Sequence, residues 1–363
     1  MMYTVPTITK NSRPSHYKKA VAFCVDKAYL PYASFVANQI LEKEKNRDFD
    51  VIICVPERDL LFPIPDSEIR YCSIDYSCML NLPVGRLSMA TYHKIFLPAI
   101  FKEEYEQILY LDADVYLNSS CISSLMSSYK ENKGLAMAVD ISEIERKSGL
   151  NFHNNYLNRY ANLNHQYRNA GVILFNTKRL AEINYLEQLM NYAEKNKQKL
   201  LRHDQTLINT VLSNEISSLS FLFNYQLIDT TIPLLDEFKP KILHFVGELK
   251  PWNTEFGFIG SFHAEYDSFI RTHFPHHQLH SKSEFELKYE SRKKKRKYKN
   301  PVREKLSLNV FVGKERLKGI IAYFSKPRNS ETVEKRKIRR IISRFRASID
   351  RSICESDVQP ARS

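Results

Sequence analysis

Glycine, tryptophan and paired cysteines are scarce in this sequence. Of its 363 residues, 9 are glycine and one, Trp252, is tryptophan, and none of the six cysteines forms a Cys-x-x-Cys pair. A collagen-like chain needs glycine at every third position, and a disulfide-stapled miniprotein is short and rich in cysteine, so both classes are excluded. We expect the reduced thiols of a cytosolic protein, with Cys24 and Cys54 inside buried strands.

Long apolar runs are also missing. The first residues lack the apolar stretch of a signal peptide, and no uninterrupted run of about 18 apolar residues could span a bilayer. Apolar residues nevertheless make up 43% of the chain and charged residues 26%, which is the balance of a globular protein and not of a disordered one. We therefore expect a folded cytoplasmic protein with one large domain of roughly 250 residues and an extension.

Positive charge is concentrated at one end of the chain. Residues 281–363 hold 25 Lys and Arg against 10 Asp and Glu, whereas residues 1–280 hold 29 against 31. Any argument for an anionic partner therefore concerns this tail alone. We expect a polar leader over residues 1–19, a main domain over residues 20–281 and a basic region over residues 282–363.

Short apolar runs alternate with helical segments along the main domain, which predicts an α/β fold. The runs are apolar at nearly every residue, a pattern typical of a mostly parallel sheet that is covered on both faces. Strands are expected at residues 20–25, 51–55, 69–74, 108–111, 134–140, 171–176 and 241–246, and helices at 29–45 and 88–101, with two more over 178–213. Ligands bind beyond the carboxyl ends of such strands, where Asp26, Asp112, Asp114 and Asp140 lie.

The segment ILYLDADVYL places Asp112 and Asp114 two residues apart, just beyond a buried strand. Carboxylate oxygens are hard ligands that suit Mg²⁺ or Mn²⁺, and these ions usually complete their coordination with substrate phosphates. Taken alone, an Asp-x-Asp pair also fits a solvated loop or a helix cap.

A second motif, HFVGELKPW, begins at His244. A neutral imidazole can bind a metal and favours Mn²⁺ over Mg²⁺. Gly247 leaves room for a phosphate to approach backbone N–H groups, and Lys250 adds a positive charge for it. The same segment also fits a core histidine at a strand end followed by an ordinary turn.

Together these segments resemble glycosyltransferase family 8, whose retaining enzymes include glycogenin and the bacterial lipopolysaccharide galactosyl- and glucosyltransferases. The likeness runs in order through AFCVDKAYLPY, TYHKIFLP, ILYLDADVYL, RNAGVILFN, HDQTLIN and HFVGELKPW. Such an ordered set is more specific than either motif. The resemblance implies a GT-A fold, in which helices flank a mixed sheet.

The resemblance also implies roles for residues that hold the nucleotide and its metal. Asp26 and Tyr29 match the carboxylate and the aromatic that hold uridine, although Tyr29 could instead pack in the core. Asp112 and Asp114 match residues that bind Mn²⁺ and the ribose or diphosphate, with His244 as the third metal ligand.

Further matches concern the diphosphate and the donor sugar. Gly247 and Lys250 correspond to residues that hold the diphosphate leaving group. Lys94 corresponds to a basic residue that reaches the donor, and a solvated helix lysine is its alternative. The matches to residues that line the donor sugar are Asp140, Asn169, Ala170, Asp204 and Gln205. Asp140 could equally cap a helix, and Asn169 could be a turn residue.

The implied reaction is transfer of galactose or glucose from UDP-hexose to a hydroxyl, with retention at the anomeric carbon. Mn²⁺, or alternatively Mg²⁺, and Lys250 would stabilise the leaving UDP, Gln205 would lie beneath the anomeric carbon, and Asp204 would orient the acceptor or the donor sugar. Ala28, Thr206 and Arg168 depart from the family pattern near the uridine, acceptor and sugar contacts. A silent UDP- and metal-binding scaffold is the alternative.

The basic region has apolar residues at helical spacing. They are Leu317, Ile320, Ile321 and Phe324, then Ile338, Ile341, Ile342, Phe345 and Ile349. A basic amphipathic helix suits an anionic membrane surface, so we expect a helical extension attached to the inner face of the cytoplasmic membrane, near a glycolipid acceptor. A solvated tail is one alternative. Nucleic-acid binding is another, which an apolar stripe disfavours.

Overall fold

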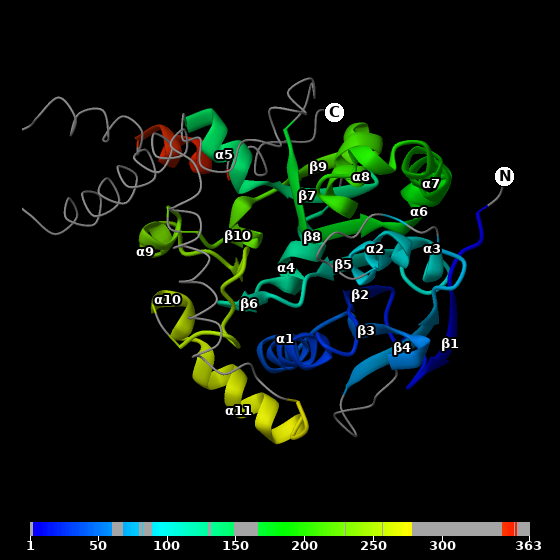
Figure 1. Ribbon diagram of the computed structural model, residues 1–363, viewed down its shortest axis with the longest axis horizontal. Coiled ribbons are helices and arrows are strands. Elements are labelled where there is room, and N and C mark those ends of the chain that lie inside the picture. The colour runs from blue at the N-terminus through cyan, green and yellow to red at the C-terminus, as the bar shows by residue number, and fades with distance from the viewer. Residues whose placement is uncertain are drawn as a thin grey trace, which may run out of the picture.

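The computed structural model describes residues 3–59, 68–79, 82, 89–129, 132–148, 166–228, 230–255, 257–277, 343–351 and 353. Within these ranges eight strands form one sheet in the order β1-β4-β3-β2-β5-β8-β7-β9 (Figure 1). The strands are β1 (Thr7–Asn11), β2 (Lys19–Cys24), β3 (Asp50–Pro56), β4 (Ile69–Asp75), β5 (Gln107–Leu111), β7 (Leu135–Val139), β8 (Arg168–Asn176) and β9 (Ile216–Leu219).

The large sheet is mixed. Strands β4, β3, β2 and β5 run parallel to one another, and β7 runs parallel to β9. Strand β8 is antiparallel to both of its neighbours, β5 and β7, and β1 is antiparallel to β4 at the edge. The apolar pattern alone, which predicts a mostly parallel sheet, misses the reversed direction of β8. The mixed sheet that the family resemblance implies is confirmed.

A small sheet, ordered β10-β11-β6, joins the large one through the turn after β5. Its strands are β6 (Val115–Leu117), β10 (Tyr225–Gln226) and β11 (Ile242–His244). Strand β11 runs antiparallel to β6, and Val115 pairs with His244. This pairing brings the motif that begins at His244 next to the Asp112–Asp114 turn.

Helices cover both faces of the large sheet (Figure 1). They are α1 (Leu30–Lys43), α2 (Ala90–His93), α3 (Leu97–Ile100), α4 (Ile122–Ser128), α5 (Ile141–Ser148), α6 (Thr177–Glu182), α7 (Tyr185–Lys195), α8 (His203–Val211), α9 (Leu235–Phe238), α10 (Gly257–Gly260) and α11 (His263–His273). Val21 and Phe23 of β2 pack with α1, α4 and α11, while Ala20 and Ala22 pack with α2, α3 and α6–α8. Successive residues of a strand face opposite sides, so the sheet is apolar throughout.

Several expectations about local structure are corrected. Residues 7–11 of the polar leader form an edge strand of the sheet. The helix expected over residues 88–101 is broken by a 3₁₀ turn at Lys94–Phe96. Helix α3 follows from Leu97, with Pro98 in its first turn. The region 178–213 holds three helices instead of two. Cys24 and Cys54 are buried free thiols, as expected.

A helix over residues 343–351 packs against the body beside α5 (Figure 1). Phe345 and Ile349 are buried in a cluster with Leu243 and Phe245, which lie on either side of His244 in the chain. Arg346 pairs with Glu237 at 2.9 Å. These two apolar residues therefore contact the body and form no free apolar face. The rest of the expected apolar stripe, from Leu317 to Ile342, lies outside the described residues, as does the boundary at residue 282.

None of the helices in the described ranges combines the length and the apolar content needed to cross a membrane.

Candidate active site

The turn between β5 and β6 lies at the junction of the two sheets. The backbone N–H of Asp112 donates to the Gly171 carbonyl of β8 at 2.8 Å, and the N–H of Phe245 donates to the Asp114 carbonyl at 2.9 Å. The turn is thus held on one side by the large sheet and on the other by the small one. A cavity of about 670 Å³ opens beside it, at the carboxyl ends of β2 and β5.

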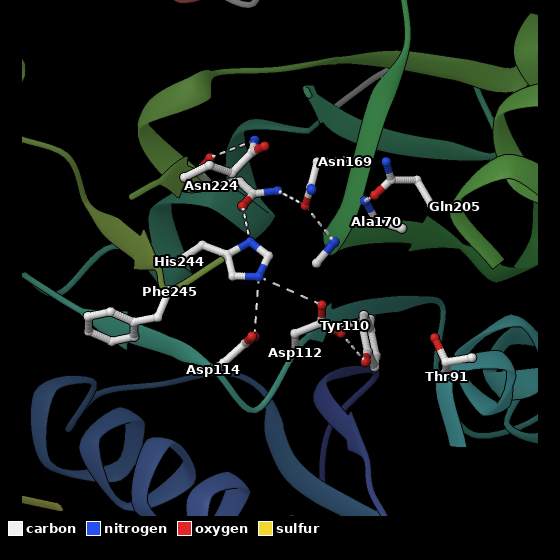
Figure 2. Close-up of polar contacts among 12 residues, drawn as sticks. Thr91, Tyr110, Asp112, Asp114, Asn169, Ala170, Gln205, Asn224, His244 and Phe245 are labelled. Atoms are coloured by element: carbon white, nitrogen blue, oxygen red, sulfur yellow. Dashed lines mark hydrogen bonds and ion pairs between the residues drawn. The ribbon is translucent and has the colours of Figure 1, made fainter. Parts of the chain in front are cut away.

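Asp112, Asp114 and His244 converge on one point. Their nearest ligand atoms all lie within 4.8 Å of one another, and Nε2 of His244 is 3.2 Å from Oδ1 of Asp114 and 3.8 Å from Oδ2 of Asp112. Figure 2 shows the imidazole edge directed at both carboxylates. Two carboxylate oxygens and an imidazole nitrogen form a donor set that fits Mn²⁺, and Mg²⁺ less well.

Gly171 of β8 makes this convergence sterically possible. A Cβ atom at this position would lie 2.2 Å from Cε1 of His244, 2.8 Å from its Nδ1 and 3.0 Å from Oδ2 of Asp112. Strand β8 therefore approaches His244 and Asp112 so closely that only a residue without a side chain fits.

Lys250 supplies a positive charge on the same side of the cavity. Its Nζ donates to Oδ2 of Asp114 and to the carbonyl of Phe245, and the side chain is largely buried. Burial alone raises the pKa of Asp114, but the charge of Lys250 and the hydrogen bonds from Lys250 and His244 outweigh it and hold this pKa far below its usual value. Asp114 is consequently ionised at neutral pH.

Lys94 lines the cavity, and its side chain is buried. Its Nζ is 3.0 Å from Oδ1 of Asp112, 3.0 Å from Oδ2 of Asp204 and 3.2 Å from the Ala170 carbonyl. Burial alone lowers the pKa of Lys94, but the two carboxylates raise it above its usual value. The alternative of a solvated helix lysine is therefore wrong, because Lys94 is buried and forms ion pairs with both Asp112 and Asp204.

Gln205 has both ends of its amide engaged. Its Oε1 accepts a hydrogen bond from the backbone N–H of Ala170 at 3.1 Å, and its Nε2 donates one to Oδ2 of Asp140 at 3.0 Å. Oδ2 of Asp140 also accepts a hydrogen bond from Nδ2 of Asn169 at 3.1 Å. Its Oδ1 accepts a hydrogen bond from the backbone N–H of Ser142 in α5. Asp140 thus contacts the start of a helix, as its alternative suggested, and also holds the two amides.

Strand β2 ends where the sequence predicts a nucleotide contact. Oδ1 of Asp26 accepts the N–H groups of Ala28 and Tyr29 at 3.2 Å each. Tyr29 is 44% exposed, so the alternative of core packing is wrong for this ring. Its ring lies edge-on to the ring of Trp252, with the two centroids 6.2 Å apart. Trp252 in turn stacks on Tyr32, with their ring centroids 3.9 Å apart. Gly247 has a φ of +91°, a conformation that favours glycine.

The structure brings nearly all of the predicted site residues together. Those that line the cavity are Asp26, Tyr29, Lys94, Asp112, Asp114, Asn169, Ala170, Asp204, Gln205, His244, Gly247 and Lys250. Asp140 does not line it, because its carboxylate lies behind Asn169 and Gln205. The prediction that Asp140 lines the donor site is corrected to a supporting position.

Some residues of the site escape prediction from the sequence. Tyr110 donates to Oδ1 of Asp112 at 2.5 Å, and Thr91 donates to Oδ1 of Asp204 at 2.8 Å. Asn224, which is fully buried, contacts Nδ1 of His244 at 2.8 Å. Tyr110 could be suspected from its place in the strand before Asp112. Nothing in the sequence around Thr91 or Asn224 signals these contacts.

Comparison with known proteins now decides the family. The family model described as glycosyl transferase family 8 matches residues 20–255, which include every residue of the site described above. The chain belongs to glycosyltransferase family 8. The resemblance seen in the sequence is thus confirmed.

The curated relatives are distant in sequence. Glycosyltransferase GlyF of Streptococcus pneumoniae is 22% identical over 65% of this chain and 58% of its own length. Lipopolysaccharide 1,3-galactosyltransferase of Salmonella typhimurium is 26% identical over 50% of this chain and 55% of its own length. The chain thus spans slightly more than half the length of these two relatives.

Two solved glycosyltransferase structures confirm the fold. The galactosyltransferase LgtC, solved with donor and acceptor sugar analogs, matches with a TM-score of 0.57 at 16% identity, over 70% of this chain and 96% of that one. The bifunctional glycosyltransferase WbbM matches with a TM-score of 0.53 at 21% identity, over 72% of this chain and 50% of that one. The described body therefore has the GT-A fold.

Proposed function

We propose that this protein is a retaining hexosyltransferase that moves galactose or glucose from UDP-hexose to a hydroxyl of a lipopolysaccharide or another surface glycan. The convergence of Asp112, Asp114 and His244 in a polar cavity, with Lys250 beside them, carries this proposal. A divalent cation between these ligands would face the same cavity as Tyr29 and Asp26, which we propose as the contacts of the uridine. The curated galactosyltransferase relative supports the acceptor class.

The leaving group is the part of the reaction that this site suits best. Asp112, Asp114 and His244 would hold a Mn²⁺ ion, which would supply Lewis-acid stabilisation of negative charge on a departing diphosphate. Lys250 adds a cation whose position is fixed by Asp114 and by the Phe245 carbonyl. Such fixed charges favour the transition state, because they need no reorganisation as charge develops.

Retention at the anomeric carbon requires either a protein nucleophile or attack on the face that UDP leaves. Gln205 is a poor nucleophile, and both ends of its amide are already hydrogen-bonded. The carboxylate of Asp204 is held by Lys94 and Thr91. We therefore propose front-face substitution, in which the acceptor hydroxyl attacks beside the leaving UDP and passes its proton to the departing phosphate. Trapping of a glycosyl-enzyme at any residue would overturn this route.

The first test is UDP release from a panel of UDP-sugars, measured with Mn²⁺ and then with EDTA. We expect one UDP-hexose to be hydrolysed slowly with metal, and release to fall by at least about 100-fold in the Asp112→Asn Asp114→Asn variant, because the metal loses two of its protein ligands. Binding is followed separately through quenching of Trp252, the one tryptophan, which lies beside Tyr29.

The outcomes of this test separate the alternatives. UDP binding without consumption of any sugar, even with glycolipid acceptors, would favour a scaffold over an enzyme. Turnover that is unchanged by EDTA and by the double substitution would contradict the metal-dependent mechanism.

We propose further that the basic region over residues 282–363 attaches the enzyme to the anionic inner face of the cytoplasmic membrane, where a glycolipid acceptor would lie. Its support is the excess of 25 Lys and Arg over 10 Asp and Glu in residues 281–363. Each such cation contributes roughly 1 kcal/mol near an anionic surface. Since Phe345 and Ile349 pack against the body, charge carries this proposal more than the apolar stripe does.

The membrane proposal predicts a salt-sensitive association with vesicles. We expect the full chain to sediment with vesicles that contain phosphatidylglycerol, and to sediment several-fold less when Lys293, Lys294, Lys295 and Lys297 are replaced by serine. These substitutions spare the helix over residues 343–351, whose loss in a truncation would expose the apolar cluster beneath it. Equal sedimentation of both proteins would refute the proposal. Preference for nucleic acid over vesicles would favour that alternative partner.

A further inference from the structure

A chain of hydrogen bonds runs from the metal site into the core behind it. Nδ1 of His244 is 2.8 Å from Oδ1 of Asn224, whose Nδ2 donates to Oδ1 of Asn169 at 2.9 Å. Nδ2 of Asn169 donates to Oδ2 of Asp140 at 3.1 Å. His244, Asn224, Asn169 and Asp140 are all buried. Figure 2 shows the two amides in line between the imidazole and β8.

The orientation of Asn169 is fixed by groups that can act in only one way. The backbone N–H of Gly171 can only donate, and it lies 2.9 Å from the atom that must therefore be Oδ1 of Asn169. The carboxylate of Asp140 only accepts, so it requires the Nδ2 end of the amide. Both neighbours demand the same orientation, although amide oxygen and nitrogen are otherwise hard to tell apart.

This orientation propagates along the chain to the imidazole. Because Asn169 presents its oxygen, Asn224 must present Nδ2 to it, and Asn224 therefore turns Oδ1 toward His244. An oxygen at 2.8 Å from Nδ1 requires a proton on that nitrogen. The other nitrogen, Nε2, faces the carboxylates of Asp112 and Asp114.

We propose that Asn224 and Asn169 are positioning residues that keep a proton on Nδ1 of His244, so that Nε2 is the nitrogen that binds the divalent cation. This inference rests on the proposed metal-dependent function. The hydrogen bond made by one ring nitrogen fixes which nitrogen a metal meets, and loss of such a partner typically weakens metal binding by about 10–100-fold. The same chain holds Asp140, which also orients Gln205, so it connects the metal ligand to the donor-sugar side of the cavity.

The protonation of Nδ1 is directly measurable in the wild-type protein without metal. We expect the ¹⁵N spectrum of histidine-labelled protein to show a protonated-type shift at Nδ1 of His244, with a slowly exchanging N–H. The signal is assigned by its absence in His244→Gln. A bare Nδ1 would overturn the proposal whether or not the protein binds metal, and no other variant has to fold for this result.

The positioning role is tested by Asn224→Leu. We expect Mn²⁺ affinity, measured by electron paramagnetic resonance in the presence of UDP, to fall by about 10–100-fold. Turnover should recover as Mn²⁺ is raised, because the ligands themselves remain. A purely structural defect would lower turnover at every Mn²⁺ concentration, and unchanged Mn²⁺ affinity would contradict the role of Asn224.

Asn209→Leu is the matched control. Asn209 is equally buried, accepts the Arg168 N–H at 2.7 Å and donates to the Arg168 and Gln205 carbonyls at 2.8 Å each, but it has no bond to the chain that ends at His244. We expect it to lower stability and leave Mn²⁺ affinity and the Nδ1 signal unchanged. If wild type binds no Mn²⁺ with UDP while the Nδ1 proton is present, the proposed function fails and the hydrogen-bond chain stands.

Discussion

Replacement of Gly171 by alanine is expected to lower sugar transfer by at least about 100-fold. The added methyl group would lie 2.2 Å from Cε1 of His244 and 3.0 Å from Oδ2 of Asp112, and neither ligand can move without leaving the other. Misplacement of a reacting group by about 1 Å costs about 100-fold in rate. UDP release measured across a Mn²⁺ titration should show weaker metal dependence together with a lower maximal rate.

Gly134→Ala is the control. It tests whether a methyl group added at any crowded glycine next to the sheet lowers sugar transfer. A Cβ at Gly134 would lie 2.7 Å from Cδ2 of Leu180, the far end of a flexible side chain that does not line the cavity. We expect it to reduce thermal stability modestly and to keep activity. Near-normal transfer by Gly171→Ala would show that β8 can withdraw from the metal ligands and would contradict the close approach described here.

Replacement of Lys94 by methionine is expected to reduce kcat/KM by at least about 100-fold, the cost of removing one preorganised electrostatic contact. It should also lower the free energy of unfolding by about 3 kcal/mol. The buried Nζ lies 3.0 Å from both Asp112 and Asp204, so its removal leaves two carboxylates facing each other without their shared cation. Donor kinetics and urea unfolding measure the two effects on the same preparations.

Lys102→Met serves as the comparison, because Lys102 pairs with Glu103 at 3.7 Å and both side chains are largely exposed. Exposed ion pairs contribute about 0–1 kcal/mol, so neither stability nor activity should change measurably. Wild-type behaviour of Lys94→Met would show that Asp112 and Asp204 are held by other groups and that Lys94 has no part in the site.

The three candidate metal ligands can be predicted from the sequence because each follows or ends an apolar strand. Asp112 and Asp114 come directly after β5, and His244 is the last residue of β11. The pairing that brings His244 to them lies in the small sheet, where β11 runs antiparallel to β6, so only the order of the motifs along the chain predicts it. Proximity of the ligands therefore follows from local patterns together with the family resemblance.

The supporting residues depend on strand register, which local patterns do not reveal. Gly171 meets the metal ligands because β8 runs antiparallel to β5 and pairs Leu111 with Val172. A prediction of mostly parallel strands places this glycine elsewhere. Asn224 precedes β10, a strand of two residues that gives no periodic signal. In the sequence Lys94 looks like a surface lysine of a helix. Only the tertiary fold places the carboxylates of Asp112 and Asp204 next to its Nζ.

The pairing of β6 with β11 also bears on the order of events during folding. Val115 and His244 are neighbours in the small sheet but lie far apart along the chain. Contacts of such long range form slowly, because the entropy of closing a large loop must be overcome before they contribute stability. The strands β2 to β5 can pair while β11 is still unsynthesised or unfolded. A nascent chain should therefore form the end of the cavity that Asp26 and Tyr29 line before His244 joins Asp112 and Asp114, so the candidate metal site is completed late in folding.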